Sequence, residues 1–240
     1  MPRIKTNLKT FSSPAEDSSK KIPKKLRDIL RFAYTNRFSD FYRKKFDAAG
    51  ITLGNIKILT DFQQFPFTSK EEIMARDPDG LLFLPLSKVD YVRFSSGTSG
   101  RGLSVVYKAH GKIDEFYKDF MKDVRRVLVL NSPRGVPQEY DRYRSLGKLV
   151  VVGEPQNLEA SSILAEKTKV DTISASASLL LLFTERLKQH YSLDRIKLLR
   201  LHAEGTTPLQ RKLIKNQYPN ALVIATYSST ETGNIAYQCP

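Results

Sequence analysis

Residues 93–108 contain small hydroxyl and glycine residues between two stretches that have the composition of β-strands. Glycine permits positive φ and a close approach of the backbone, so peptide N–H groups can converge on anionic oxygens. Hydroxyl groups and a guanidinium would add donors and a fixed positive charge. The segment therefore predicts a triphosphate site formed by Ser95, Ser96, Gly97, Thr98, Ser99, Gly100 and Arg101.

The common phosphate-binding motifs do not describe this segment. Gly97 and Gly102 have the glycine spacing of a P-loop, but Leu103 stands where that motif requires lysine. The dinucleotide fingerprint G-x-G-x-x-G is missing here too. Clusters of glycine and serine also form ordinary hairpin turns, so this segment alone leaves the structural alternative open.

Two further polar segments follow apolar, strand-like runs near the end of the chain. Residues 197–201 precede the polar residues 202–208, and residues 221–225 precede the polar residues 226–233. Open parallel sheets bind their ligands at the carboxyl ends of the strands. The sequence therefore predicts that both polar segments contribute to one ligand site.

The three segments, in this order, resemble the adenylate-forming superfamily of acyl-coenzyme A synthetases, and most closely its phenylacetate-coenzyme A ligase branch. The motifs are Ser-Ser-Gly-Thr-Ser-Gly from Ser95, Ala-Glu-Gly-Thr-Thr-Pro from Ala203 and Tyr-Ser-Ser-Thr-Glu from Tyr227. Residues 41–50 and 65–72 are similar to the opening of that branch. The ordered set of motifs is more specific than any one of them, and the likeness extends from about residue 22 to the end of the chain.

The resemblance implies a role for each motif. The segment from Ser95 to Arg101 would surround the ATP phosphates, residues 203–205 would line the adenine, and Tyr227 would stack on the purine. Thr230 would lie near the α-phosphate and Glu231 would bind Mg²⁺, and these two are the implied catalytic residues. The residues implied to contact the nucleotide are Ser95, Ser96, Gly97, Thr98, Ser99, Gly100, Arg101, Ala203, Glu204, Gly205 and Tyr227.

The implied reaction has two steps. The carboxylate of a small-molecule acid attacks the α-phosphorus of ATP, pyrophosphate leaves, and the thiol of coenzyme A then takes the acyl group from the adenylate. One alternative from another class stays open, a non-catalytic nucleotide-binding or interaction module. Within the enzyme class, an acyl-protein synthetase that loads a cysteine is a further alternative. The carboxylic acid itself is not specified by the sequence.

The chain departs from the family pattern in several places, including Arg101 and Gly102, where the phosphate segment of relatives has lysine and proline. His202 stands where a glycine is usual, and Ser228 follows Tyr227 in place of glycine. Relatives continue beyond the tyrosine motif through a ribose-binding aspartate and a mobile domain that carries a catalytic lysine, whereas this sequence ends at Pro240. We therefore expect an incomplete adenylation-enzyme large domain that forms little or no thioester by itself.

The periodicity of apolar residues predicts an α/β fold. Residues 1–21 are expected to form a basic, flexible arm, residues 22–90 a helical amino-terminal region, and residues 91–240 the ATP-binding part, a mostly parallel sheet with helices on both faces. The predicted helices are 22–36, 39–49, 112–124, 157–168, 179–189 and 207–216, with a short one from Ser69. The predicted strands are 91–94, 103–107, 127–130, 148–152, 171–174, 197–201 and 221–225.

Composition narrows the class of protein further. The 240 residues carry a net charge of +14, to which residues 1–25 contribute seven Lys or Arg against two acidic residues. A solvated tail and ordinary helix faces account for most of this charge, so we expect no nucleic-acid partner. No apolar run approaches the ~18 residues of a membrane span. The single cysteine, Cys239, and the lack of a signal peptide indicate a cytoplasmic protein. The sequence leaves the oligomeric state open, with a homodimer among the alternatives.

Overall fold

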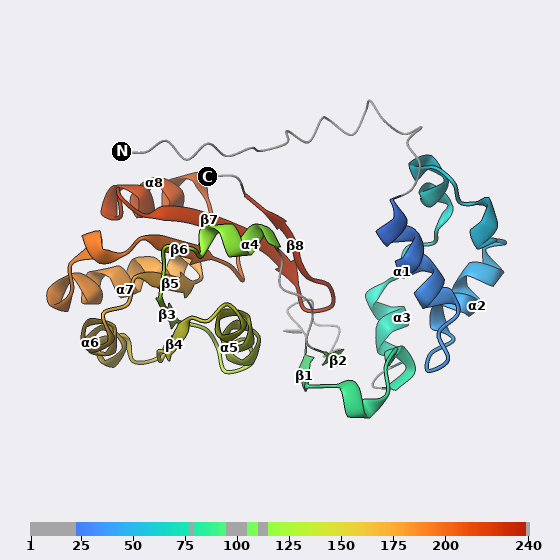
Figure 1. Cartoon of the computed structure of the whole chain (residues 1–240), viewed down its shortest axis with the longest axis horizontal. Helices are drawn as coiled ribbons and strands as arrows, with labels where there is room; N and C mark the ends of the chain where they lie inside the picture. The colour runs from blue at the N-terminus through green and yellow to red at the C-terminus, as the bar shows by residue number, and fades with distance from the viewer. Residues whose placement is uncertain (1–22, 77–78, 95–104, 110–114, 239–240) are drawn as a thin grey trace. The chain divides into compact units, whose positions relative to one another are not determined.

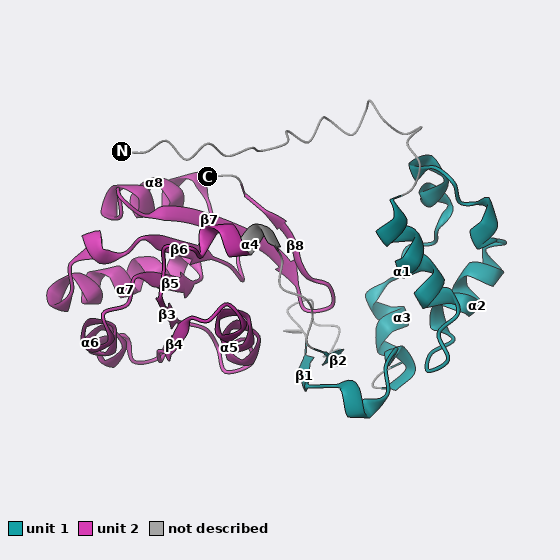
Figure 2. Cartoon of the chain, viewed as in Figure 1, with its two compact units in different colours: residues 1–109 teal, residues 110–240 magenta. Residues whose placement is uncertain are grey.

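The computed structural model describes residues 23–76, 79–94, 105–109 and 115–238, with side chains from residue 118 in the last range. The chain divides into two compact units, Met1–Ala109 and His110–Pro240 (Figure 2). The predicted arm, residues 1–21, lies outside the described residues.

Unit 1 is mostly helical. Its α-helices are α1 (Lys24–Tyr34), α2 (Phe41–Ala48) and α3 (Lys70–Met74), and its short 3₁₀ helices are Leu53–Asn55, Leu59–Gln64, Asp79–Leu81 and Leu86–Lys88. The apolar sides of α1 and α2 form a small core of Leu30, Phe46, Ile51 and Ile56. The predicted helices of this region are confirmed, with ends a few residues inside the predicted ones.

Local signals in the sequence set two of these helix ends. Gly50, the residue after the C-cap Ala49 of α2, adopts φ +68°, a conformation that favours glycine, and so terminates the helix as expected. Ser69 begins α3 with a capping box, because its hydroxyl accepts the Glu72 N–H at 3.2 Å while the Glu72 carboxylate accepts the Ser69 N–H at 2.7 Å. Strands β1 (Tyr91–Phe94) and β2 (Val105–Lys108) then pair antiparallel.

The sheet of unit 2 has the order β4-β3-β5-β6-β7-β8 in its described residues (Figure 1). The strands are β3 (Arg126–Val129), β4 (Leu149–Val152), β5 (Thr172–Ala175), β6 (Leu198–Leu201), β7 (Leu222–Ser229) and β8 (Gly233–Tyr237). The neighbours from β4 to β7 are parallel, and only β8 is antiparallel to its neighbour. The predicted mostly parallel α/β sheet is confirmed.

Helices cover both faces of this sheet, as predicted (Figure 1). On one face α6 (Leu158–Thr168), α7 (Ala177–His190) and α8 (Pro208–Gln217) pack on apolar strand residues such as Leu128, Ile173 and Leu199. On the other face Tyr143 of α5 (Val136–Ser145) and Met121, which follows α4 (Glu115–Phe120), pack on a second core. Within the described residues, no helix combines the length and apolarity needed to cross a membrane.

Unit 2 differs from the sequence predictions at α5, at the end of β7 and at β8, for which no strand was predicted. Helix α5 occupies a stretch for which the sequence predicted no element, and β7 continues to Ser229 instead of ending near residue 225. The first difference arises because α5 is charged and buries only Glu139 and Tyr143. The second arises because pairing with β8 extends the strand beyond its apolar run.

Candidate functional site

The carboxyl ends of three parallel strands meet at one edge of the sheet. Ala175 of β5, Leu201 of β6 and Ala225 of β7 are neighbours in register. The next residues, Ser176, His202 and Thr226, therefore lie together at this edge, here called the carboxyl edge. Two of the three predicted motifs, residues 203–205 and the segment from Tyr227, begin directly beyond it.

The first of these motifs is tied to the amino terminus of helix α7. Ala203 has φ +70°, a left-handed conformation that is uncommon for alanine. The Glu204 carboxylate accepts a hydrogen bond from the Ser178 N–H at 2.6 Å, and the Gln210 amide donates to the Ser178 hydroxyl at 3.0 Å. The turn after β6 is thus bound to α7, which is in turn bound to α8. The negative charge of Glu204 lies where the helix dipole favours an anion.

The second motif presents its functional groups to solvent. The Tyr227 side chain is 67% exposed on β7, next to an irregularity in the pairing with β8. Thr230 is half-buried and Glu231 is exposed in the turn between β7 and β8. The hydroxyls of Ser229 and Thr232, 2.9 Å apart, brace this turn. An exposed aromatic ring and an exposed carboxylate thus lie on one hairpin.

The predicted triphosphate segment, Ser95 to Arg101, lies outside the described residues. The two strands that enclose it are described, and Phe94 of β1 pairs with Val105 of β2. The two predicted flanking strands are therefore confirmed in their described residues, while the role of the segment as a phosphate site stays a prediction.

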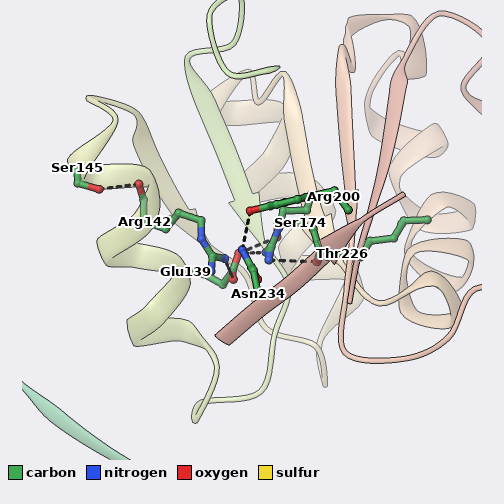
Figure 3. A network of polar contacts seen from close by, with 9 residues as sticks. Glu139, Arg142, Ser145, Ser174, Arg200, Thr226 and Asn234 are labelled. Carbon is green, nitrogen blue, oxygen red and sulfur yellow. Dashed lines mark hydrogen bonds and ion pairs between the residues drawn. The ribbon is translucent and has the colours of Figure 1, made fainter. Parts of the chain in front are cut away.

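Beneath the carboxyl edge lies a buried polar network that the sequence analysis missed (Figure 3). Arg200 of β6 and Arg142 of α5 both donate to the Glu139 carboxylate. The Ser174 hydroxyl of β5 also donates to that carboxylate, at 3.0 Å, and Arg200 reaches the Thr226 hydroxyl of β7 at 3.3 Å. The network therefore joins three neighbouring strands to one helix.

Burial determines the electrostatics of this network. The side chains of Arg200 and Glu139 are 2% and 5% exposed, and that of Arg142 is 13% exposed. Burial alone would raise the pKa of the Glu139 carboxyl, but Arg200 and Arg142 outweigh it and hold that pKa well below its usual range. Glu139 is therefore an anion at neutral pH.

His202 lies next to the network and is neutral at neutral pH. Burial and the charge of Arg200 lower the pKa of its imidazole to about 4, although Glu139 acts in the opposite direction. The one sequence signal for the whole network is Arg200 itself, because a charged residue inside the apolar strand Leu198–Leu201 requires a buried partner.

The fold resembles part of the fold of a CoA ligase of known structure. The chain resembles a crystal structure of 2-hydroxyisobutyryl-CoA ligase in an open conformation, in complex with 2-HIB-AMP and CoA. The alignment covers 92% of this chain and 59% of the ligase chain, with a TM-score of 0.67 and 17% identity. The thioesterification state of the same enzyme matches 85% of this chain and 47% of its own, with a TM-score of 0.65 and 18% identity. At this identity the likeness concerns the fold alone.

Sequence comparison adds named relatives over part of the chain. The phenylacetate-coenzyme A ligases of Aromatoleum evansii and Escherichia coli are 40% and 35% identical over 83 residues, which are 35% of this chain and 18% of each relative. The enzyme of Thermus thermophilus is 36% identical over 75 residues, 31% of this chain and 17% of its own. No family model matches. The predicted resemblance to this branch is confirmed over the aligned part, which spans less than a fifth of these relatives.

Proposed function

We propose that this chain carries the ATP- and acid-binding part of an AMP-forming acid–thiol ligase. The observation that carries the proposal is the 40% identity over 83 residues to a phenylacetate-coenzyme A ligase. The fold supports it, because the parallel sheet brings two of the three predicted motifs to one carboxyl edge.

The residues at the carboxyl edge are suited to a nucleotide. The exposed ring of Tyr227 offers a π face to a purine, and residues 203–205 form a fixed turn beside it. We assign Ser95 to Arg101 to the phosphates, on the composition of that segment. The Thr230 hydroxyl would donate to an α-phosphate oxygen.

The exposed carboxylate of Glu231 fits a magnesium ion that is shared with phosphates. No group of three or more histidine, cysteine, aspartate or glutamate side chains within the described ranges could hold a metal. Mg²⁺ in nucleotide sites is commonly bound by one or two carboxylates together with the phosphates, so one protein ligand is compatible with that mode. When bound, the ion would neutralise phosphate charge.

In the first step, the side chains need only position the reactants and neutralise their charge. A carboxylate oxygen of the acid forms a bond to the α-phosphorus, the bond from that phosphorus to the bridging oxygen breaks, and pyrophosphate leaves with the electron pair. Because two anions must meet, donors such as Arg101 and Thr230 would lower the barrier by neutralising charge and aligning the acid. Coenzyme A is the proposed acceptor in the second step. A cytoplasmic location and a homodimer stay predictions.

Calorimetric titration with ATP and Mg²⁺ tests the nucleotide site. Tyr227→Ala should weaken ATP binding at least about fivefold, since stacking of a base on an aromatic ring contributes about 1–3 kcal/mol. Tyr227→Phe keeps the ring and is the matched control, with an affinity close to that of the unchanged chain. Equal affinity of the alanine variant would contradict the assignment.

Carboxylate-dependent exchange of pyrophosphate into ATP separates the proposal from its alternatives. Exchange with phenylacetate or another acid supports the ligase, whereas ATP binding without exchange for any acid favours a non-catalytic nucleotide-binding module. Stable transfer of acyl label to the protein would indicate an acyl-protein synthetase.

A further inference from the structure

The side chain of Thr226 joins the ends of the two strands that carry the proposed nucleotide motifs. Its hydroxyl donates to the Leu201 carbonyl of β6 at 3.2 Å, and the Arg200 guanidinium donates to the same hydroxyl at 3.3 Å (Figure 3). Because Thr226 is 7% exposed, water competes little for these hydrogen bonds. A buried hydroxyl thus attaches β7 to β6 at the carboxyl edge.

The two residues that this hydrogen bond joins lie next to the two motifs. Leu201 is two residues before Ala203, where the proposed adenine turn begins, and Thr226 directly precedes Tyr227. Leu201 and Ala225 are the last pair of β6 and β7 in register. The hydroxyl therefore adds a contact between the two strands at the point where their ladder ends and the two motifs begin.

The other neighbour of β7 holds this segment less regularly. The pairing of β7 with β8 shifts register between Tyr227 and Ser228. Such an irregularity interrupts a ladder locally, so the position of the Tyr227 backbone depends more on the contacts of β7 with β6. The hydrogen bonds of Thr226 lie on that side of the strand.

The group that donates to Thr226 is itself held in place. The guanidinium of Arg200 also donates to the buried carboxylate of Glu139. The Ser174 hydroxyl of β5 donates to the same carboxylate at 3.0 Å. Hydrogen bonds that involve ionised groups are stronger than neutral ones, so the network gives the Thr226 hydroxyl a well-fixed partner.

We propose that Thr226 is a positioning residue for the nucleotide, whose buried hydroxyl sets the spacing between the turn at residues 203–205 and the ring of Tyr227. The purine binds between these two groups, and the Thr226 side chain does not touch it. This inference rests on the proposed function, because it assumes that a purine stacks on Tyr227.

Calorimetric titration with ATP and Mg²⁺ of the full chain tests the role of the hydroxyl. Thr226→Val keeps the branched shape of the side chain and should weaken ATP binding at least about fivefold, because a displaced ring stacks poorly on the base. Thr226→Ser keeps the hydroxyl and should bind ATP within about twofold of the unchanged chain. Unaltered affinity in Thr226→Val would overturn the inference. If the unchanged chain does not bind ATP, the proposed function itself is refuted.

A double variant shows whether Thr226 acts through Tyr227. In Tyr227→Ala the ring is gone, so its spacing from the turn no longer matters. Adding Thr226→Val to that variant should therefore change ATP affinity by less than about twofold. General damage to the fold would instead weaken ATP binding by the same factor with and without the ring, and that result would contradict a positioning role.

Thr184→Val is the matched control for the loss of a buried hydroxyl. The Thr184 hydroxyl is bonded to the Leu180 carbonyl and to the Tyr218 hydroxyl, both at 2.7 Å. It lies about 10 Å along α7 from Ala177, the first residue of that helix. The control should lower stability but keep ATP affinity within about twofold. If it weakens ATP binding as much as Thr226→Val does, the effect is not specific to the carboxyl edge and the inference fails.

Hydrogen exchange on the unchanged chain covers the case in which Thr226→Val does not fold. If Thr226 preforms the edge, the backbone amides of residues 198–202 and 222–227 should exchange slowly before ATP is added. Fast exchange in these two segments that becomes slow only with ATP would mean that the nucleotide orders the edge, and Thr226 would then have no positioning role.

Discussion

Glu139→Gln removes the carboxylate that Arg200 and Arg142 share, and keeps nearly the same side-chain shape. The amide can still accept a hydrogen bond from Ser174, so the change isolates the charge. Because Arg200 is 2% exposed, water cannot take the place of the lost anion. Removing one partner of a buried ion pair costs about 3–5 kcal/mol, and we expect a loss in this range for unit 2.

Urea unfolding followed by far-ultraviolet circular dichroism measures this loss at pH 7. The matched control is Glu185→Gln, since Glu185 pairs with Lys188 on the surface of α7, where the two side chains are 59% and 44% exposed. The control should lower the free energy of unfolding by less than about 0.5 kcal/mol. A loss of the same small size in both variants would refute the reasoning.

A double variant separates the charge from the packing of the network. In Glu139→Leu combined with Arg200→Met, no buried charge of that pair is left uncompensated. Replacing a buried pair by apolar side chains is often close to neutral, so the double variant should be more stable than Glu139→Gln. If the loss of stability in the double variant equals the sum of the losses in Glu139→Leu and Arg200→Met, the two residues act independently.

Three further predictions concern stability. Folding lowers the pKa of His202 from 6.5 to about 4, so its contribution to the free energy of unfolding is complete above pH 6.5 and is lost as the pH falls toward 4. At pH 5 the free energy of unfolding should therefore be about 2 kcal/mol lower than at pH 7, and this decrease should be absent in His202→Gln. The same pH profile in that variant as in the unchanged chain would contradict the assignment. Thr207→Ala removes the hydroxyl that caps α8 and should cost about 1 kcal/mol in urea unfolding, whereas Thr207→Ser should cost little, and equal costs would argue against the cap. Phe183→Ala empties a fully buried position between α7 and the sheet and should cost about 3–5 kcal/mol, far more than Leu182→Ala on the exposed side of the same helix.

Local patterns in the sequence predict most of the elements, because those elements depend on their own residues. The capping serine of α3, the glycine after α2 and Pro208 at the start of α8 all act within one helical turn. The alternation of apolar runs predicts the parallel sheet for the same reason. Helix α5 was missed because its sequence is charged, although Pro137 in its first turn and Arg142 and Arg144 in its last turn are typical helix signals.

The sequence indicated the motifs of the candidate site but not the buried polar network beneath them. Motif order indicated Tyr227 and residues 203–205, and the register of β6 and β7 brings their positions to one edge. The polar network escaped prediction because its members are far apart in the chain, from Glu139 to Thr226, and each looks ordinary in its own segment. Only tertiary structure brings an arginine of one strand to a glutamate of an unpredicted helix.

The order of strands in unit 2 has a kinetic consequence. Leu199 of β6 pairs with Val223 of β7, although the whole of α8 separates them along the chain. Leu128 pairs with Ile173, and α5 and α6 both lie between these two residues in the sequence. Chains that rely on such distant pairings lose much conformational entropy before the contacts compensate, so they fold slowly. The short hairpin of β7 and β8 closes locally, by contrast, and unit 2 should therefore acquire its parallel strands in the rate-limiting step, after that hairpin is able to form.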